Sequence, residues 1–302
     1  MFVIFSQVLI LLIFVTIGFV LGKGNVVKTE HTKILSSLLV YVFLSCNIYK
    51  TFSARFSLAY IATNYRLLLI SAVVLCVLLV VAHFAAKVFS KNKYERCIYE
   101  YSLVIPNYGY IGYALAEALF GQAGLINFMT FAVPVSLYTY TFGFAKLTKQ
   151  GASLKKLCNP VIISMVLGII AGLSGFTVPD VLTDVINKAS GCMAPVSMLL
   201  AGIVISGFSL KSMLSNIKSY GFVMLRLVVI PLLLGTVLCL FCEQRVVQTA
   251  ILFYALPCGL NTVVFPRLVD ENCQIGAGLA LISTVLSCVT LPVILTIFHI
   301  GG

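Results

Sequence analysis

The sequence is poor in charge and has no tryptophan. Charged side chains make up 10% of the 302 residues, whereas 61% are hydrophobic, and the mean hydropathy is +1.10. A chain with so few charges and apolar stretches from end to end leaves no room for a soluble domain. Without tryptophan, any aromatic belt at a membrane interface must come from tyrosine and phenylalanine. The composition therefore predicts a multi-pass protein of the cell membrane, with lipid around it.

Catalytic and metal-binding motifs are also missing. There is no phosphate-binding glycine loop followed by Lys-Ser/Thr and no His/Glu metal motif, and the ten cysteines lack metal-ligand spacing. The net charge of +11 could suggest nucleic acid, but the basic residues lie in short loops between apolar spans. We therefore expect no enzyme activity, no cofactor, no metal and no nucleic-acid partner.

Apolar stretches long enough to cross a bilayer follow one another along the whole chain. A crossing helix needs about 20 mostly apolar residues. By that measure the sequence predicts an all-α integral membrane fold with ten transmembrane helices, at Phe2–Gly22, Lys33–Phe52, Arg66–Phe89, Cys97–Phe120, Leu125–Leu147, Pro160–Gly175, Val181–Phe208, Tyr220–Phe241, Val246–Leu268 and Ile275–Ile300.

Loop charge predicts the orientation. Fourteen basic residues fall on one side: Lys23, Lys28, Lys33, Lys87, Lys91, Lys93, Arg96, Lys146, Lys149, Lys155, Lys156, Lys211, Lys218 and Arg267. The other side has Lys50, Arg55, Arg66 and Arg245, with Lys188 uncertain. Because cytoplasmic loops carry the excess of Lys and Arg, both termini are expected to be extracytoplasmic.

Spans four and nine break at matching places. Pro106 and Pro257 lie 151 residues apart, which is half of the chain, and each has an asparagine after it, Asn107 directly and Asn261 four residues later. Proline interrupts a helix, and paired breaks in two halves indicate a transporter site. We predict two inverted five-helix repeats, residues 1–147 and 160–302, joined by a cytoplasmic loop at 148–159, with the broken helices crossed. Chance is the alternative, since proline is frequent in membrane helices.

The crossed breaks are the predicted substrate site. Two half-helix N-termini facing a common point would attract an anion, notably a carboxylate. Asparagine amides, a threonine hydroxyl and glycines that let a ligand approach the backbone would complete it. The residues are Pro106, Asn107, Tyr108, Gly109, Pro257, Gly259, Asn261 and Thr262. The alternative is a pair of packing kinks whose asparagines bond neighbouring carbonyls.

Three further residues are candidates for the same cavity or for coupling. Asn47 and Pro195 lie in the second and seventh spans, although Asn47 could equally hold two helices together. Glu100 lies seven residues before Asn107 and is the candidate proton carrier. Proton coupling is favoured over sodium because no acidic pair lies within a span.

At these residues the chain resembles the auxin efflux carrier family, whose bacterial members include malate- and malonate-type permeases. The resemblance rests on Pro106 to Gly112, Leu154 to Pro160, Ala194-Pro195 and Pro257 to Phe265. It implies ten spans in two inverted repeats, similar to the bile acid–sodium symporters. It also implies a homodimer, and a binding role for the Pro and Asn residues of the two breaks. Ser45 stands where members often have proline.

Together these features predict a secondary active transporter of a small organic anion, auxin-like or a dicarboxylate, that works by alternating access. A non-transporting sensor on the same scaffold and a sodium-coupled symporter stay open as alternatives. A channel is not favoured, because the sequence has no ring of charges or carbonyl filter motif.

Overall fold

The computed structural model describes residues 2–55, 57–149, 160–176 and 178–300, which form helices and short connections. Within this part of the chain the only β-type pairing is an isolated bridge between Pro106 and Cys258. The all-α class is therefore confirmed. The predicted connecting loop at 148–159 lies outside the described residues from position 150 onward.

The first half of the chain runs from α1 to α7. Its elements are α1 (Phe2–Lys23), a 3-10 turn (Thr29–His31), α2 (Thr32–Leu38), a π-helical turn (Leu39–Leu44), α3 (Ser45–Arg55), α4 (Leu58–Phe89), α5 (Lys93–Val104), a π-helical turn (Tyr108–Gly112), α6 (Tyr113–Tyr138), a π-helical turn (Thr139–Gly143) and α7 (Phe144–Leu147). Inside α6, Gly121 has φ of 66° and interrupts the helix, at the polar corner that the sequence marks with Gly121-Gln122.

The second half runs from α9 to α16. Its elements are α9 (Pro160–Ser174), α10 (Asp180–Ser206), α11 (Leu210–Leu214), α12 (Ile217–Met224), a π-helical turn (Leu225–Val229), α13 (Ile230–Phe241), α14 (Gln244–Ala255), α15 (Asn261–Leu268) and α16 (Gln274–Ile297). The break between α14 and α15 corresponds in order to the break between α5 and the turn that leads into α6.

Among the described residues, six helical segments are long and apolar enough to cross a membrane: Thr32–Ala54, Leu58–Phe89, Ala123–Leu147, Asp180–Ser206, Ile217–Phe241 and Gln274–Ile297. Leu9–Lys23 and Pro160–Ser174 are shorter apolar helices. One predicted boundary is corrected: α4 begins at Leu58 rather than near Arg66, because the Ser57 hydroxyl caps its first turn by accepting a hydrogen bond from Tyr60 N. The chain is thus a multi-pass membrane protein.

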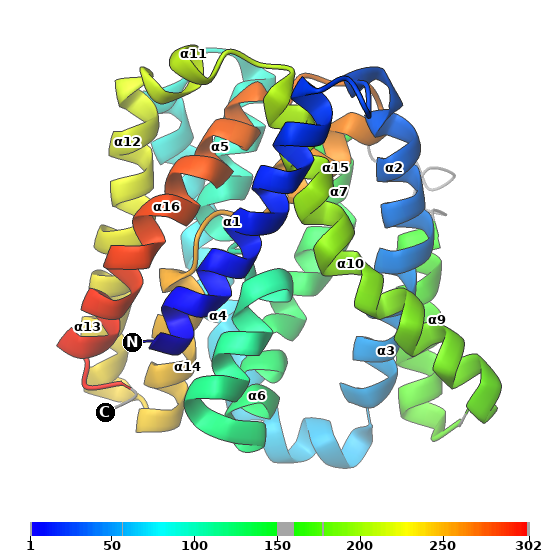
Figure 1. Cartoon of the computed structure of the whole chain (residues 1–302). Helices are drawn as coiled ribbons and strands as arrows, with labels where there is room; N and C mark the ends of the chain where they lie inside the picture. Colours follow the sequence, from blue (N-terminus) through cyan, green and yellow to red (C-terminus); the bar gives the residue numbers. More distant parts are fainter. Residues whose placement is uncertain (1, 56, 150–159, 177, 301–302) are drawn as a thin grey trace.

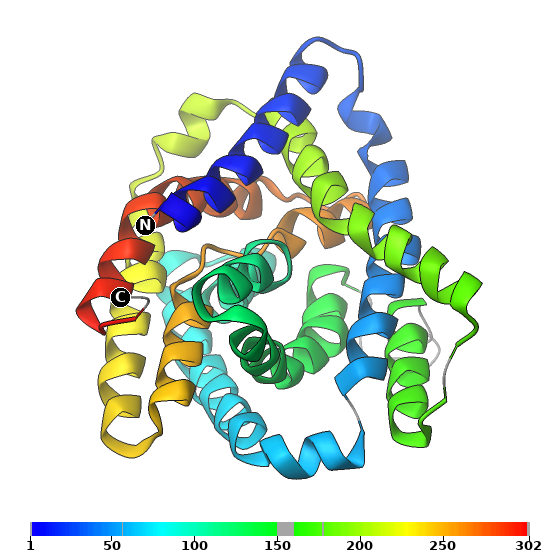
Figure 2. The same cartoon turned by 60° about the horizontal axis from the view of Figure 1, so that its bottom comes forward.

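The helices form two groups that mix the halves of the sequence. α1 packs along α10, and α3 packs along α9 and α10, whereas α4 packs against α5 and α6, and α14 against α6, α13 and α16. Figure 2 shows α1, α3, α9 and α10 gathered along one side of the molecule, with α6 at its centre. The first helices of the first half, α1 and α3, therefore pack mainly against the first helices of the second half, α9 and α10.

The α1–α10 contact depends on small residues. A Cβ at Gly202 would lie 2.0 Å from the Val15 carbonyl oxygen, and one at Gly18 would lie 2.2 Å from the Leu199 carbonyl oxygen. Such close backbone approach is typical of helix pairs in membranes, where small residues replace the hydrophobic drive for association.

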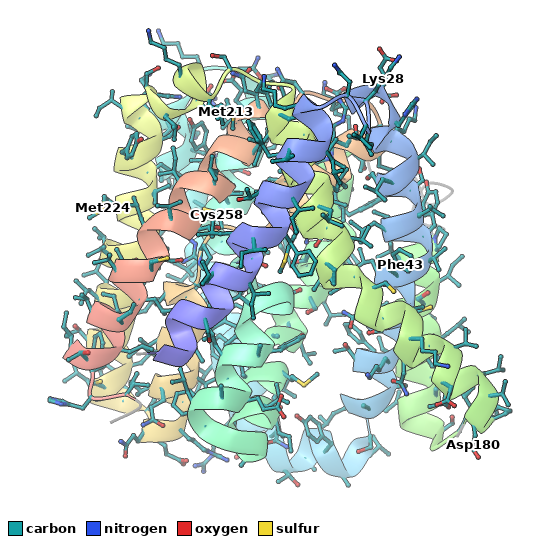
Figure 3. The ribbon with its side chains drawn as sticks, in the orientation of Figure 1. Lys28, Phe43, Asp180, Met213, Met224 and Cys258 are labelled. Carbon is teal, nitrogen blue, oxygen red and sulfur yellow. The ribbon has the colours of Figure 1, made fainter. Side chains whose placement is uncertain are left out.

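Both termini lie on the same side of the molecule, at the end opposite α11 and the turn between α1 and α2 (Figure 1). Lys28, in that turn, and Asp180, at the start of α10, lie at opposite ends of the structure (Figure 3).

Candidate functional site

The two proline breaks meet inside the bundle. α5 and α15 occupy one half of its height and α14 and the first part of α6 the other, and the extended segments between them cross at the middle (Figure 1). Ile105 and Leu256, the residues before the prolines, both have extended backbones, with ψ of 107° and 155°. Proline favours that conformation in the residue before it, and both helices end here, whereas Pro134, Pro195, Pro266 and Pro292 lie inside helices.

Backbone hydrogen bonds join the two segments where they cross. Asn107 N donates to Pro257 O at 2.8 Å, and Gly259 N donates to Ile105 O at 3.2 Å. Cys258 N, which neither of these bonds uses, donates to the Ser283 hydroxyl of α16 at 3.0 Å. Extended backbone at membrane depth is tolerated only when its polar groups are paired in this way.

Glycine at position 259 is required by this close approach. A Cβ there would lie 3.3 Å from the carbonyl oxygens of both Ile105 and Pro106. Gly259 therefore lets the two segments pack closely at the crossing, because a larger residue would push them apart.

A small cavity of about 20 Å³ lies against the crossing, with the N-terminal ends of both half-helices in its wall. Its lining consists of Pro106, Asn107, Tyr108, Gly109, Tyr140, Met193, Gly259, Leu260 and Asn261. The structure thus brings six of the eight predicted break residues to one cavity. Because that volume holds roughly one water molecule, the conformation is closed to any carboxylate.

The two asparagines in the wall have unused hydrogen-bonding capacity. Asn107 is 1% exposed, and neither its Nδ2 nor its Oδ1 has a partner among the described residues. Asn261 Nδ2 donates to the Tyr101 hydroxyl at 2.9 Å, whereas its Oδ1 has no partner within the same part of the chain. Buried amides are normally satisfied, so these groups are available to a ligand.

Aromatic packing fixes the wall on the side of Tyr108. The Tyr108 hydroxyl and the Ser136 hydroxyl are 2.9 Å apart, and the Tyr108 ring stacks on Phe253 with ring centroids 5.3 Å apart. Phe253 in turn contacts the rings of Phe128 and Phe131. Because Phe253 belongs to α14 and Tyr108 to the other break, this stack couples the two half-helices.

Four predicted residues lie outside the cavity wall. Pro257 contributes its carbonyl to the crossing, and the Thr262 hydroxyl, in the first turn of α15, donates to Gly259 O of the preceding segment at 3.1 Å. Asn47 Oδ1 accepts a hydrogen bond from the Ser190 hydroxyl at 2.8 Å, which joins α3 to α10. Pro195 lies within α10, and its neighbour Met193 lines the cavity instead.

Glu100 lies in an ion-pair cluster and not in the cavity wall. Its carboxylate is 3.0 Å from Lys146 Nζ and 3.0 Å from His83 Nδ1, and its side chain is 13% exposed. The cluster joins α4, α5 and α7 in the half of the molecule that holds α5. Among the described residues no group of three or more His, Cys, Asp or Glu side chains could hold a metal ion.

Sequence reasoning missed four residues that bear on the site. Tyr140, Met193 and Leu260 line the cavity. Nothing in the local sequence distinguishes Tyr140 and Met193 from other span residues, whereas Leu260 stands between Gly259 and Asn261 in the predicted break. The fourth is Arg226, which is 0% exposed in the π-helical turn between α12 and α13. Its signal was available, because Arg226 lies inside the predicted span Tyr220–Phe241, six residues from the start of that span.

A helical membrane protein whose two broken helices meet at a buried, partly unsatisfied polar cavity has the features of a transporter. The sequence matches the membrane transport protein family over residues 3–156 and 144–295, and the chain belongs to that family. It is 29% identical over 219 residues to an uncharacterized transporter of Methanocaldococcus jannaschii, with 68% of this chain and 70% of the relative covered. The resemblance to the auxin efflux carriers is thereby confirmed at the level of the family.

Proposed function

We propose that the protein is a secondary active transporter of a small organic anion, with the crossing as its substrate site. The observation that carries this proposal is the pair of asparagines, Asn107 and Asn261, which present unpartnered amide atoms to one buried cavity. In a desolvated site such groups bind a polar ligand strongly, because they lose nothing to water when it binds.

The closed cavity supports the proposal of alternating access. A volume of about 20 Å³ excludes the substrate, so the walls must separate on one side to admit it and on the other to release it. The wall includes Met193 of α10, from one helix group, and Asn107 and Gly259 of the crossing, from the other. Relative movement of the two groups would therefore open the cavity.

The proposed architecture has ten spans in two inverted repeats, 1–147 and 160–302. It is supported by the matching order of breaks in the two halves and by the opposite directions in which α5 and α14 approach the crossing (Figure 1). The proposed orientation has both termini outside the cell, on the strength of loop charge. A homodimer remains part of the proposal through the family resemblance alone.

Proton coupling through Glu100 is the proposed energy source, with sodium as the less favoured alternative. In this structure the Glu100 carboxylate contacts both Lys146 and His83. A proton that binds Glu100 would therefore compete with the Glu100–Lys146 ion pair. Coupling through Glu100 therefore requires that the Lys146 contact opens in one state of the transport cycle. The cluster would then link protonation to movement of α4, α5 and α7 relative to one another.

The experiment is uptake into proteoliposomes over a panel of mono- and dicarboxylates and their amides, with imposed proton or sodium gradients. We expect accumulation of a carboxylate and no accumulation of its amide. Equal transport of both would refute the anion proposal, and accumulation that follows a sodium gradient at constant pH would refute proton coupling. Binding without transport under every gradient would favour the sensor alternative.

A further inference from the structure

A buried arginine lies beside the crossing with no carboxylate to balance it. Arg226 is 0% exposed at the middle of the segment Ile217–Phe241, and it takes part in no ion pair among the described residues. A charge at membrane depth is expensive and is retained where it serves a function. Figure 3 shows Met224, two residues earlier, at nearly the same height in the bundle as Cys258 of the crossing.

The guanidinium group reaches the end of α14 that forms the crossing. Arg226 Nη1 donates to the carbonyl oxygen of Tyr254, and the guanidinium carbon lies 5.8 Å from the centroid of the Tyr254 ring. Tyr254 is the last residue but one of α14 and precedes Pro257 by three positions. The carbonyls of this last helical turn lack intrahelical partners, so Arg226 serves as a cap supplied by another helix.

Helix dipoles alone do not make the crossing positive. The N-terminal ends of α15 and of the turn leading into α6 each contribute roughly half a positive charge. The C-terminal ends of α5 and α14 meet at the same place and contribute roughly half a negative charge each. The four ends therefore cancel, and an anion would gain little from the broken helices by themselves.

We propose that Arg226 is a specificity-determining residue that gives the crossing its net positive charge and so selects an anion. This inference rests on the proposed transport function. Arg226 sits on the negative end of α14 and adds one full charge to a balanced set of dipoles. It does not line the cavity, so it acts on the substrate through its field and through the position of α14. Its Nε and Nη2 have no partner within the described residues, so neither a carboxylate nor a carbonyl offsets the charge there.

The test compares Arg226→Met and Arg226→Lys with the wild type and with Arg66→Met as the matched control. Arg66 is an exposed arginine on α4, with 65% of its side chain accessible and Glu243 as its partner. Each purified protein is titrated with malonate, malate, acetate and benzoate and with the corresponding amides. Binding is read by thermal unfolding with a thiol-reactive dye at pH 6 and pH 9.

We expect Arg226→Met to stay folded, because burying a charge without an ion-pair partner costs free energy that an apolar methionine avoids. It should bind the carboxylates about tenfold or more weakly, as expected for a charge acting across several ångströms of protein interior, and should discriminate less against the amides. Arg66→Met should bind like the wild type. Arg226→Lys should bind well at pH 6 and poorly at pH 9, because a buried lysine has a lowered pKa and loses its proton as the pH rises.

Unchanged affinity and discrimination in Arg226→Met would overturn the inference while leaving the transport proposal intact. Loss in Arg226→Met without recovery in Arg226→Lys at pH 6 would also overturn it, since shape and not charge would then decide. If the wild type binds none of the carboxylates, the proposed function fails, and the inference fails with it. Should Arg226→Met not fold, the contrast between the two pH values in Arg226→Lys decides the question.

Discussion

Replacing Asn107 by alanine should weaken substrate binding without lowering the stability of the fold. The side chain is 1% exposed, both its polar atoms lack partners within the described residues, and it makes no capping bond to the half-helix that follows. A buried unsatisfied polar group costs about 1–3 kcal/mol. We therefore expect Asn107→Ala to unfold at the same temperature as the wild type or at a higher one.

Binding should respond in the opposite sense. If the amide bonds the substrate in the desolvated cavity, its loss should weaken binding by about 1–3 kcal/mol, which is roughly a 5- to 150-fold increase in Kd. Asn261→Ala should weaken binding to a similar extent but should also destabilise the fold by about 1 kcal/mol, because Asn261 Nδ2 donates to Tyr101. The two alanine variants are thus expected to differ in unfolding stability and to show a similar loss of substrate affinity.

The assay is thermal unfolding of the detergent-purified protein with a thiol-reactive dye, because the chain has ten cysteines and no tryptophan. Ligand affinity comes from the shift of the transition with carboxylate concentration. Asn47→Ala is the matched comparison, since Asn47 lies outside the cavity wall and bonds Ser190. It should lose stability and keep binding. A destabilised Asn107→Ala that binds carboxylate normally would refute the reasoning and make the breaks packing kinks.

Three other outcomes are expected. Terminal tags should be digested by protease added outside intact cells; protection there would refute the orientation predicted from loop charge. Glu100→Gln should abolish accumulation driven by a pH gradient yet preserve substrate exchange, and continued accumulation would exclude Glu100 as the carrier. Gly202→Ala should lower stability by about 1–3 kcal/mol, because its Cβ would meet the Val15 carbonyl; an unchanged unfolding temperature would contradict the tight α1–α10 contact.

The sequence alone determined the membrane class and the positions of the two breaks. These features depend on local chemistry: long apolar runs must be helical in lipid, and Pro106 and Pro257, each with a glycine within the next three residues, disfavour a continuous helix. The distribution of Lys and Arg among the loops can likewise be read from the sequence without the tertiary structure. The residues next to the prolines were consequently placed correctly in one cavity wall, since the chain carries them there with the break.

Only the tertiary structure decided which other residues meet the crossing. Tyr140 and Met193 reach the cavity because distant helices pack there, and apolar periodicity cannot rank one buried face above another. The partner of Glu100 is Lys146, 46 residues away, and that of Arg226 is a carbonyl 28 residues away. The balance of the four helix ends was also invisible in the sequence, because the sign of the field at a point depends on every charge packed around it.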